Sequence, residues 1–301
     1  MSTKTAVMSK AKKNECEHRK VFMKMFNKMA YKHSSHTVWR DLMYMSAAAM
    51  SQPVDFRQYR EDEYLRIINS YDKAEQELFV SMFGELILAF EEEGVRDILG
   101  ELYAELDLTN AKQGQFFTPF HISKMMAAVA SSAQGLRTEI EQKGYVKVGD
   151  PCCGAGGMLI AFAAQCVAYG VNYQHDILFV AQDIDLVVAL TCHVQMSLLG
   201  MAGYVIIGNS LSNAVPGPED IWYTPMYALS GFHLRNQKTE AVTAETTEDD
   251  IDDIDDEADN VTDIVCQSEP QETAMLVVNA DDDAIDIILR ETENGQFAFD
   301  F

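Results

Sequence analysis

Apolar residues recur at helical spacing through the first hundred positions of the chain. Val21, Phe22, Met25, Phe26 and Met29 lie at i, i+3 and i+4 intervals, which is typical of a helix with one buried face. The same spacing continues from about 56 to 108, where Asp107 or Thr109 can end the last helix. The pattern predicts a helical N-terminal domain over residues 1–110 whose apolar stripes form its core.

The period changes after this point. Short apolar runs at Tyr145–Asp150, Ile177–Asp183 and Tyr204–Gly208 predict strands, and longer periodic segments at about 157–169 and 186–199 predict helices between them. Strands that alternate with helices of this length form βαβ units in a parallel sheet. The fold class is therefore α/β, and a ligand is expected beyond the carboxyl ends of the strands.

Composition agrees with a folded chain. The 301 residues are 48% hydrophobic, which is enough to bury a core. No apolar run reaches the ~18 residues of a membrane span, and the lysine-rich start has no apolar core of a secretion signal. Six cysteines lack the spacing of a disulfide framework or a zinc site, so we expect a reducing, cytoplasmic location.

Charge is distributed unevenly within the net −24. Residues 1–50 hold ten Lys/Arg and three Asp/Glu, a net +7, whereas residues 238–301 hold two and twenty-one, a net −19. DNA binding depends on local cations, so any DNA contact should use the basic N-terminal part, although a solvated helical arm explains that part equally well. The acidic tail predicts disorder over 238–272, with some strand and helix character at Ala274–Asn279 and Ala284–Leu289.

The most informative segment follows the first predicted strand. It reads Asp150-Pro151-Cys152-Cys153-Gly154-Ala155-Gly156-Gly157. Such glycines let the backbone turn tightly into a helix whose N-terminus faces a ligand. The loop lacks the Gly-Lys-Ser/Thr of a phosphate-binding loop. It suits a ligand with adenosine and amino-acid parts, in which Asp150 pairs with an ammonium group.

Two further positions have the spacing of a nucleotide site. Asp183 ends the second strand, where an acidic side chain can accept both ribose hydroxyls. Asn209 follows the third strand and can hydrogen-bond an adenine edge. An alternative is that Asp183 and Asp185 only cap the next helix.

These motifs, in this order, resemble the N6-adenine DNA methyltransferases, especially the modification subunits of type I restriction systems. Over roughly 110–212, Gln113–Pro119 (QGQFFTP) is similar to the family segment before the sheet, and Asp150–Gly157 is similar to its cofactor loop. Asp183 stands where the family usually has Glu, and Asn209 where it usually has Asp.

The resemblance implies S-adenosylmethionine as cofactor and a class I, Rossmann-like methyltransferase sheet over 111–237, whose later strands the sequence does not show. It also implies DNA as substrate, adenine N6 as target, a restriction-modification role and a specificity or restriction subunit as partner. The cofactor-binding residues implied are Phe117, Thr118, Pro119, Asp150, Pro151, Gly154, Gly156, Asp183 and Asn209.

One family motif is missing. Asn/Asp-Pro-Pro-Tyr/Phe normally follows the fourth strand and holds the flipped adenine, but the chain has no Pro-Pro pair. Pro216-Gly217-Pro218 and Tyr223-Thr224-Pro225 lack the motif's polar and aromatic members, and Ile221–Leu229 has the character of an amphipathic packing segment. Met275–Asn279 is a weaker candidate for the fourth strand. No catalytic residue is assigned.

Two hypotheses of different classes follow. The first is an S-adenosylmethionine-dependent, adenine-specific DNA methyltransferase. The second is a protein that binds the cofactor without catalysis, or an anti-restriction decoy whose carboxylates imitate DNA phosphates. We expect the scattered histidines to be surface or helix-face residues and no metal site. Cys152 and Cys153, with no base nearby, are not expected to act as catalytic thiols.

Overall fold

The computed structural model describes residues 16–108, 117–212 and 216–232, and the backbone of 275–276, 287–291 and 297–300. The chain divides into two compact units, residues 1–230 and 231–301. The predicted disordered segment 238–272 and the Gln113–Phe116 part of the motif lie outside the described residues.

Helices fill the described N-terminal part of the first unit. They are α2 (Glu17–Ala30), α3 (Ser35–Ser51), α4 (Gln58–Ile68), α5 (Lys73–Glu93) and α6 (Ile98–Glu105). Side chains fix where several of them begin: Ser34 caps α3, and Asp72 forms a capping box with Glu75 at α5. The predicted helical N-terminal segment is thereby confirmed. No helix in the described ranges has the length and apolar character needed to cross a bilayer.

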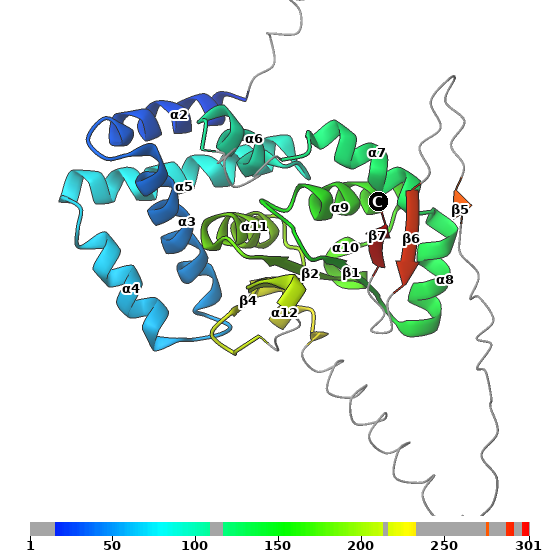
Figure 1. The fold of residues 1–301 in the computed structure, drawn as a ribbon. Coiled ribbons are helices and arrows are strands. Elements are labelled where there is room, and N and C mark those ends of the chain that lie inside the picture. Colours follow the sequence, from blue (N-terminus) through cyan, green and yellow to red (C-terminus); the bar gives the residue numbers. More distant parts are fainter. Residues whose placement is uncertain are drawn as a thin grey trace, which may run out of the picture. The chain divides into compact units, whose positions relative to one another are not determined.

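A small sheet with two crossover helices follows. After α7 (Phe120–Ala130) and α8 (Ala133–Lys143) come β1 (Val146–Asp150), α9 (Gly157–Tyr169), α10 (Tyr173–Asp176), β2 (Ile177–Asp183), α11 (Leu186–Leu198) and β3 (Gly203–Ile207). The three strands pair in parallel in the order β1-β2-β3. Figure 1 shows α9 and α11 on the same face of the sheet, as right-handed crossovers require. The α/β prediction is confirmed.

The fourth strand is not the one expected. It is β4 (Ile221–Tyr223), which runs antiparallel to β3 and is followed by α12 (Pro225–Leu229). The chain can return along β3 because Asp220 closes a turn, its carboxylate accepting from the Gly217 amide and its carbonyl from Ile207. The alternative that Met275–Asn279 supplies this strand is therefore wrong.

In the second unit, β5 (Met275–Leu276) pairs antiparallel with β6 (Ile287–Glu291), and β6 pairs antiparallel with β7 (Phe297–Asp300). The expected helical character of Ala284–Leu289 is wrong from Ile287 onward. The reason lies in pairing, because alternate partners on two neighbouring strands satisfy the backbone of β6.

The helices and the sheet of the first unit share one hydrophobic core. Trp39 on α3 is fully buried, and its indole N–H donates to Thr191 Oγ1 on α11 at 3.1 Å. Figure 1 shows α3 running beside α11. The helical segment thus packs directly on the helix that covers the sheet, so movement of either would disturb the other.

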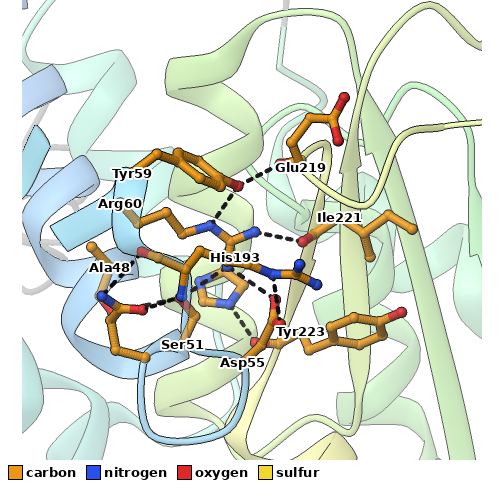
Figure 2. A network of polar contacts seen from close by, with 11 residues as sticks. Ala48, Ser51, Asp55, Tyr59, Arg60, His193, Glu219, Ile221 and Tyr223 are labelled. Carbon is orange, nitrogen blue, oxygen red and sulfur yellow. Dashed lines mark hydrogen bonds and ion pairs between the residues drawn. The ribbon is translucent and has the colours of Figure 1, made fainter. Parts of the chain in front are cut away.

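A buried arginine attaches β4 to the helices (Figure 2). Arg60 is fully buried, donates to the Ile221 carbonyl at 2.7 Å and to Asp55 at 3.2 Å, and lies 3.8 Å from the centre of the Trp222 ring. Beside it, His193 donates from Nε2 to the Tyr223 carbonyl. Burial lowers the His193 pKa to about 4. The histidines were expected on the surface or on helix faces. His193 is a helix-face residue of the buried kind, because residues 188–196 of α11 are all buried, whereas His121 and His175 are exposed.

Candidate functional site

The three parallel strands end at one edge of the sheet and bring the predicted polar residues together there. Asp150 ends β1 and is level with Ala181, while Asp183 ends β2 and is level with Ile207 of β3. Asn209 follows β3 after one residue. This is the edge at which open α/β sheets bind ligands.

A cleft of about 860 Å³ opens along this edge. It is lined by the turn before α7, the loop after β1, the start of α9, the end of β2 and the turn after β3. The lining residues include Asp97, Phe117, Thr118, Ser123, Asp150, Pro151, Cys152, Cys153, Gly154, Ala155, Gly157, Met158, Asp183, Ile184, Asp185, Val188, Gly208, Asn209, Ser210 and Leu211.

The glycine loop needs its glycines for both conformation and space. Gly154 has φ 53° and Gly156 has φ 92°, values that side-chain-bearing residues rarely adopt. A Cβ on Gly154 would lie 3.1 Å from the Phe117 ring, and one on Gly156 would lie 2.7 Å from Cys192 Sγ. The loop is therefore pressed between the aromatic wall of the cleft and α11.

Asp183 holds this loop in place. One carboxylate oxygen accepts from the Gly154 amide at 2.8 Å, and the other accepts from the Asp185 amide at 3.0 Å. Helix α11 is capped by Asp185, which accepts from Val187 and Val188. The capping alternative thus describes Asp185, whereas Asp183 joins the loop to the end of β2 and still has lone pairs facing the cleft.

The cleft is acidic throughout. Asp97, Asp150, Asp183 and Asp185 line it, and none of the lining residues that the structure describes is Lys, Arg or His. Burial, followed by the neighbouring Asp183 charge, raises the Asp150 pKa, although the Cys152 amide bonded to Asp150 opposes this. Such a site favours a ligand that carries positive charge or hydrogen-bond donors and disfavours phosphate.

Most of the predicted cofactor-binding residues meet in this cleft. Seven of the nine line it, and the other two adjoin it, since Gly156 lies inside the loop and Pro119 is the N-cap residue before α7. Cys152 is exposed in the cleft, whereas Cys153 is buried, and its hydrogen bond with Cys192, followed by burial, raises its pKa. The described residues contain no cluster of three or more His, Cys, Asp or Glu that could hold a metal.

Residues 94–230 match the family model described as N-6 DNA methylase. The match begins just before Asp97 and ends after α12, so it includes the whole cleft and all four strands of the sheet. The family resemblance of the motifs is therefore confirmed over this segment.

A solved structure is also similar. It is described as a candidate class I S-adenosylmethionine-dependent methyltransferase from Listeria monocytogenes, with 17% sequence identity and a TM-score of 0.36. The alignment covers 61% of this chain and 56% of that chain, so this chain spans little more than half of its length. No curated protein matches the sequence.

The direction of β4 places the two candidate segments for the catalytic tetrapeptide of the N-6 DNA methylases at opposite edges of the sheet. Because β4 is antiparallel, Tyr223 pairs with Tyr204 at the start of β3, and Tyr223-Thr224-Pro225 lies at the sheet edge opposite the cleft. Thr224 is buried and bonds to the Met201 and Gly203 carbonyls. Its role is therefore structural. Pro216-Gly217-Pro218 precedes β4 on the cleft side, without a polar or aromatic side chain.

Two cleft-lining residues and one residue behind the glycine loop, all within the N-6 DNA methylase match, were missed from the sequence. Asp97 comes from the helical N-terminal part, Ser123 from α7, and Gln195 lies behind the loop on α11. Asp97 precedes an apolar helix and resembles any helix cap in sequence. Only the packing of α6 against α11 brings it to the sheet edge, and no spacing rule expresses that packing.

Proposed function

We propose that this protein binds S-adenosylmethionine in the cleft and is a DNA methyltransferase specific for adenine N6. The observation that carries the proposal is the acidic cleft at the carboxyl edge, with its tight glycine loop and with no basic side chain among its described lining residues. The cofactor has a sulfonium and an ammonium but no phosphate, so its charge complements four carboxylates. When bound, it supplies an activated methyl group.

The positions of the cleft residues fit an adenosine group whose ribose lies at Asp183 and whose adenine lies at Asn209. Asp183 can accept from two ribose hydroxyls without losing its backbone bonds. Asn209 uses its side-chain oxygen for the Leu211 amide, which leaves its NH₂ group for a ring nitrogen of adenine. Ile184 and Leu211 are exposed apolar side chains on the cleft rim and offer flat contact to the base. Phe117 and Thr118 close the cleft beside the loop.

Target adenine would have to leave its duplex to reach the cleft. Phosphate contacts require unpaired cations nearby, but Arg19, Lys32 and Arg40 form ion pairs with carboxylates of the same unit. Lys24 and Lys28 are exposed on α2 and are the stronger candidates. A specificity or restriction subunit would supply the remaining contacts, and the free thiols of the described cysteines suit a cytoplasmic setting.

Cofactor binding without methyl transfer is a second candidate function. The observation that favours it is the lack of a Pro-Pro pair in the whole sequence, together with the position of Tyr223-Thr224-Pro225 away from the cleft. In that case the protein would act as a regulatory partner or an anti-restriction decoy.

Two measurements on the full chain test these proposals. Equilibrium dialysis with labelled S-adenosylmethionine should show binding by wild type and by Asp62→Ala, an exposed control, and strongly reduced binding by Asp183→Ala. Lack of wild-type binding would contradict both functions. Labelled methyl incorporation into mixed-sequence DNA then separates them, because transfer supports the methyltransferase and saturable binding without transfer supports the second candidate.

A further inference from the structure

A second polar region lies in the cleft, beyond the residues that suit adenosine. Asp97 is 5% exposed and Ser123 is 0% exposed, and both line the cleft next to the start of α9. A Cβ built on Gly157 would lie 2.8 Å from Asp97 Oδ2 and 4.0 Å from Ser123 Oγ. Both oxygens therefore face the same small space, which stays open because residue 157 is glycine.

Only one oxygen of the Asp97 carboxylate, Oδ1, takes part in capping α6. The Gly100 amide and the Gln195 NH₂ group both donate to Oδ1, at 3.0 and 2.7 Å. No hydrogen bond from the described residues reaches Oδ2, and none of their cations pairs with Asp97. A buried carboxylate is costly unless a partner compensates its charge, so this oxygen is suited to a cationic group.

Ser123 points to a ligand independently. Its hydroxyl is fully buried and has no hydrogen-bond partner among the described residues. A buried hydroxyl without a partner is unfavourable, and a bound group in the same space would satisfy it.

The start of α9 adds backbone N–H donors, which can bind an anion, beside the Asp97 carboxylate, which can bind a cation. Its N-cap is Gly156, and no side chain caps the helix, so the first amides, including those of Gly157 and Met158 in the cleft wall, are available to an anion. A carboxylate oxygen and free helix amides side by side match both charges of an α-amino acid zwitterion.

We propose that Asp97, Ser123 and the first turn of α9 bind the amino-acid end of the cofactor, with Asp97 Oδ2 accepting from its ammonium group. This inference rests on the proposed function and deepens it. It moves the ammonium partner from Asp150, which the sequence favoured, to Asp97. Gln195 is then a positioning residue, because it donates to Asp97 and to the Ala155 carbonyl of the loop.

Three ligands that differ in the amino-acid end test this assignment on the full chain by calorimetry. They are S-adenosylhomocysteine, its analogue without the amino group, and 5′-methylthioadenosine, which lacks the whole amino-acid end. Asp97→Asn keeps an oxygen for Gly100 and Gln195 and removes only the charge. It should weaken S-adenosylhomocysteine by about tenfold or more, while the other two ligands bind at least as well as to wild type.

Two companion variants sharpen the result. Ser123→Ala should leave the urea midpoint unchanged or raise it, because its hydroxyl has no described partner. It should weaken S-adenosylhomocysteine and leave 5′-methylthioadenosine, which lacks the amino-acid end, unaffected. Asp150→Asn tests the rival assignment: selective loss of the amino-group contribution there, and not in Asp97→Asn, overturns the proposal.

The remaining outcomes are distinct. Equal weakening of all three ligands by Asp97→Asn, or no weakening of any, overturns the subsite while the proposed function stands. Wild-type protein that binds none of the three ligands overturns the proposed function, and the subsite with it.

Discussion

Gln195 connects three parts of the protein through one buried side chain. Its oxygen accepts from the Leu99 amide at 2.9 Å in α6, and its NH₂ group donates to Asp97 at 2.7 Å and to the Ala155 carbonyl at 2.8 Å. Replacement by leucine preserves approximate volume and removes all three bonds. We predict that Gln195→Leu strongly destabilises the first unit.

The magnitude follows from the groups left behind. The Leu99 N–H and the Ala155 C=O would lose the Gln195 bond in a buried place, at about 1–3 kcal/mol each, whereas Asp97 Oδ1 keeps the Gly100 amide. Leucine recovers about 1 kcal/mol through apolar burial. The expected net loss is roughly 1–5 kcal/mol, a large part of the ~5–15 kcal/mol typical of a folded domain.

Urea unfolding followed by tryptophan fluorescence measures this loss. The two tryptophans of the chain, Trp39 and Trp222, are both buried in the first unit, so the signal reports on that unit. Gln58→Leu, an exposed position on α4, is the control and should stay within about 0.5 kcal/mol of wild type. If Gln195→Leu also changed stability by less than about 1 kcal/mol, the buried link would be refuted.

Three other predictions follow from particular contacts. Gly156→Ala should lower the free energy of unfolding in urea by about 1–3 kcal/mol, because φ is 92° and Cys192 Sγ lies 2.7 Å from the new methyl group. Gly84→Ala in α5, with open space around it, should leave the free energy of unfolding unchanged or raise it by about 0.5–1 kcal/mol. Equal effects of the two variants would contradict the strain at Gly156. Arg60→Met should cost about 2–4 kcal/mol, because it leaves the buried Ile221 carbonyl without its partner and Asp55 with Arg57 alone. Exposed Arg66→Met should cost no more than about 1 kcal/mol. Burial raises the pKa values of Asp97 and Asp150 above the ordinary 3.8. The affinity for S-adenosylhomocysteine, measured by calorimetry, should therefore fall as the pH drops through these raised values and each carboxylate gains a proton. Binding that does not change over this pH range would show that neither charge contacts the ligand.

The sequence predicted the βαβ part of the fold well because local rules determine it. Helix α9 and strand β2 have the predicted bounds, since Gly156 and Gly170 adopt left-handed conformations at the two ends of α9 and an unbroken apolar run fills both faces of β2. The meeting of Asp150, Asp183 and Asn209 at one edge followed from the parallel order of the strands alone.

Features that depend on distant contacts were beyond the sequence. The direction of β4 depends on Arg60 and on the turn at Asp220, and the burial of His193 depends on helices far away in the chain. Asp97 reaches the cleft only through the packing of α6 on α11. In sequence it resembles an ordinary helix cap, so no motif could indicate that only Oδ1 caps α6 and that Oδ2 is left for a ligand.

The most direct test of the central claim is a calorimetric titration of the full chain with S-adenosylhomocysteine, alongside Asp183→Ala. We predict saturable binding of one ligand per chain at micromolar concentrations for wild type, and a loss of affinity of at least about tenfold in the variant. Absence of wild-type binding, or equal affinity in Asp183→Ala, would contradict the claim that the acidic cleft at the sheet edge is a nucleoside-binding site.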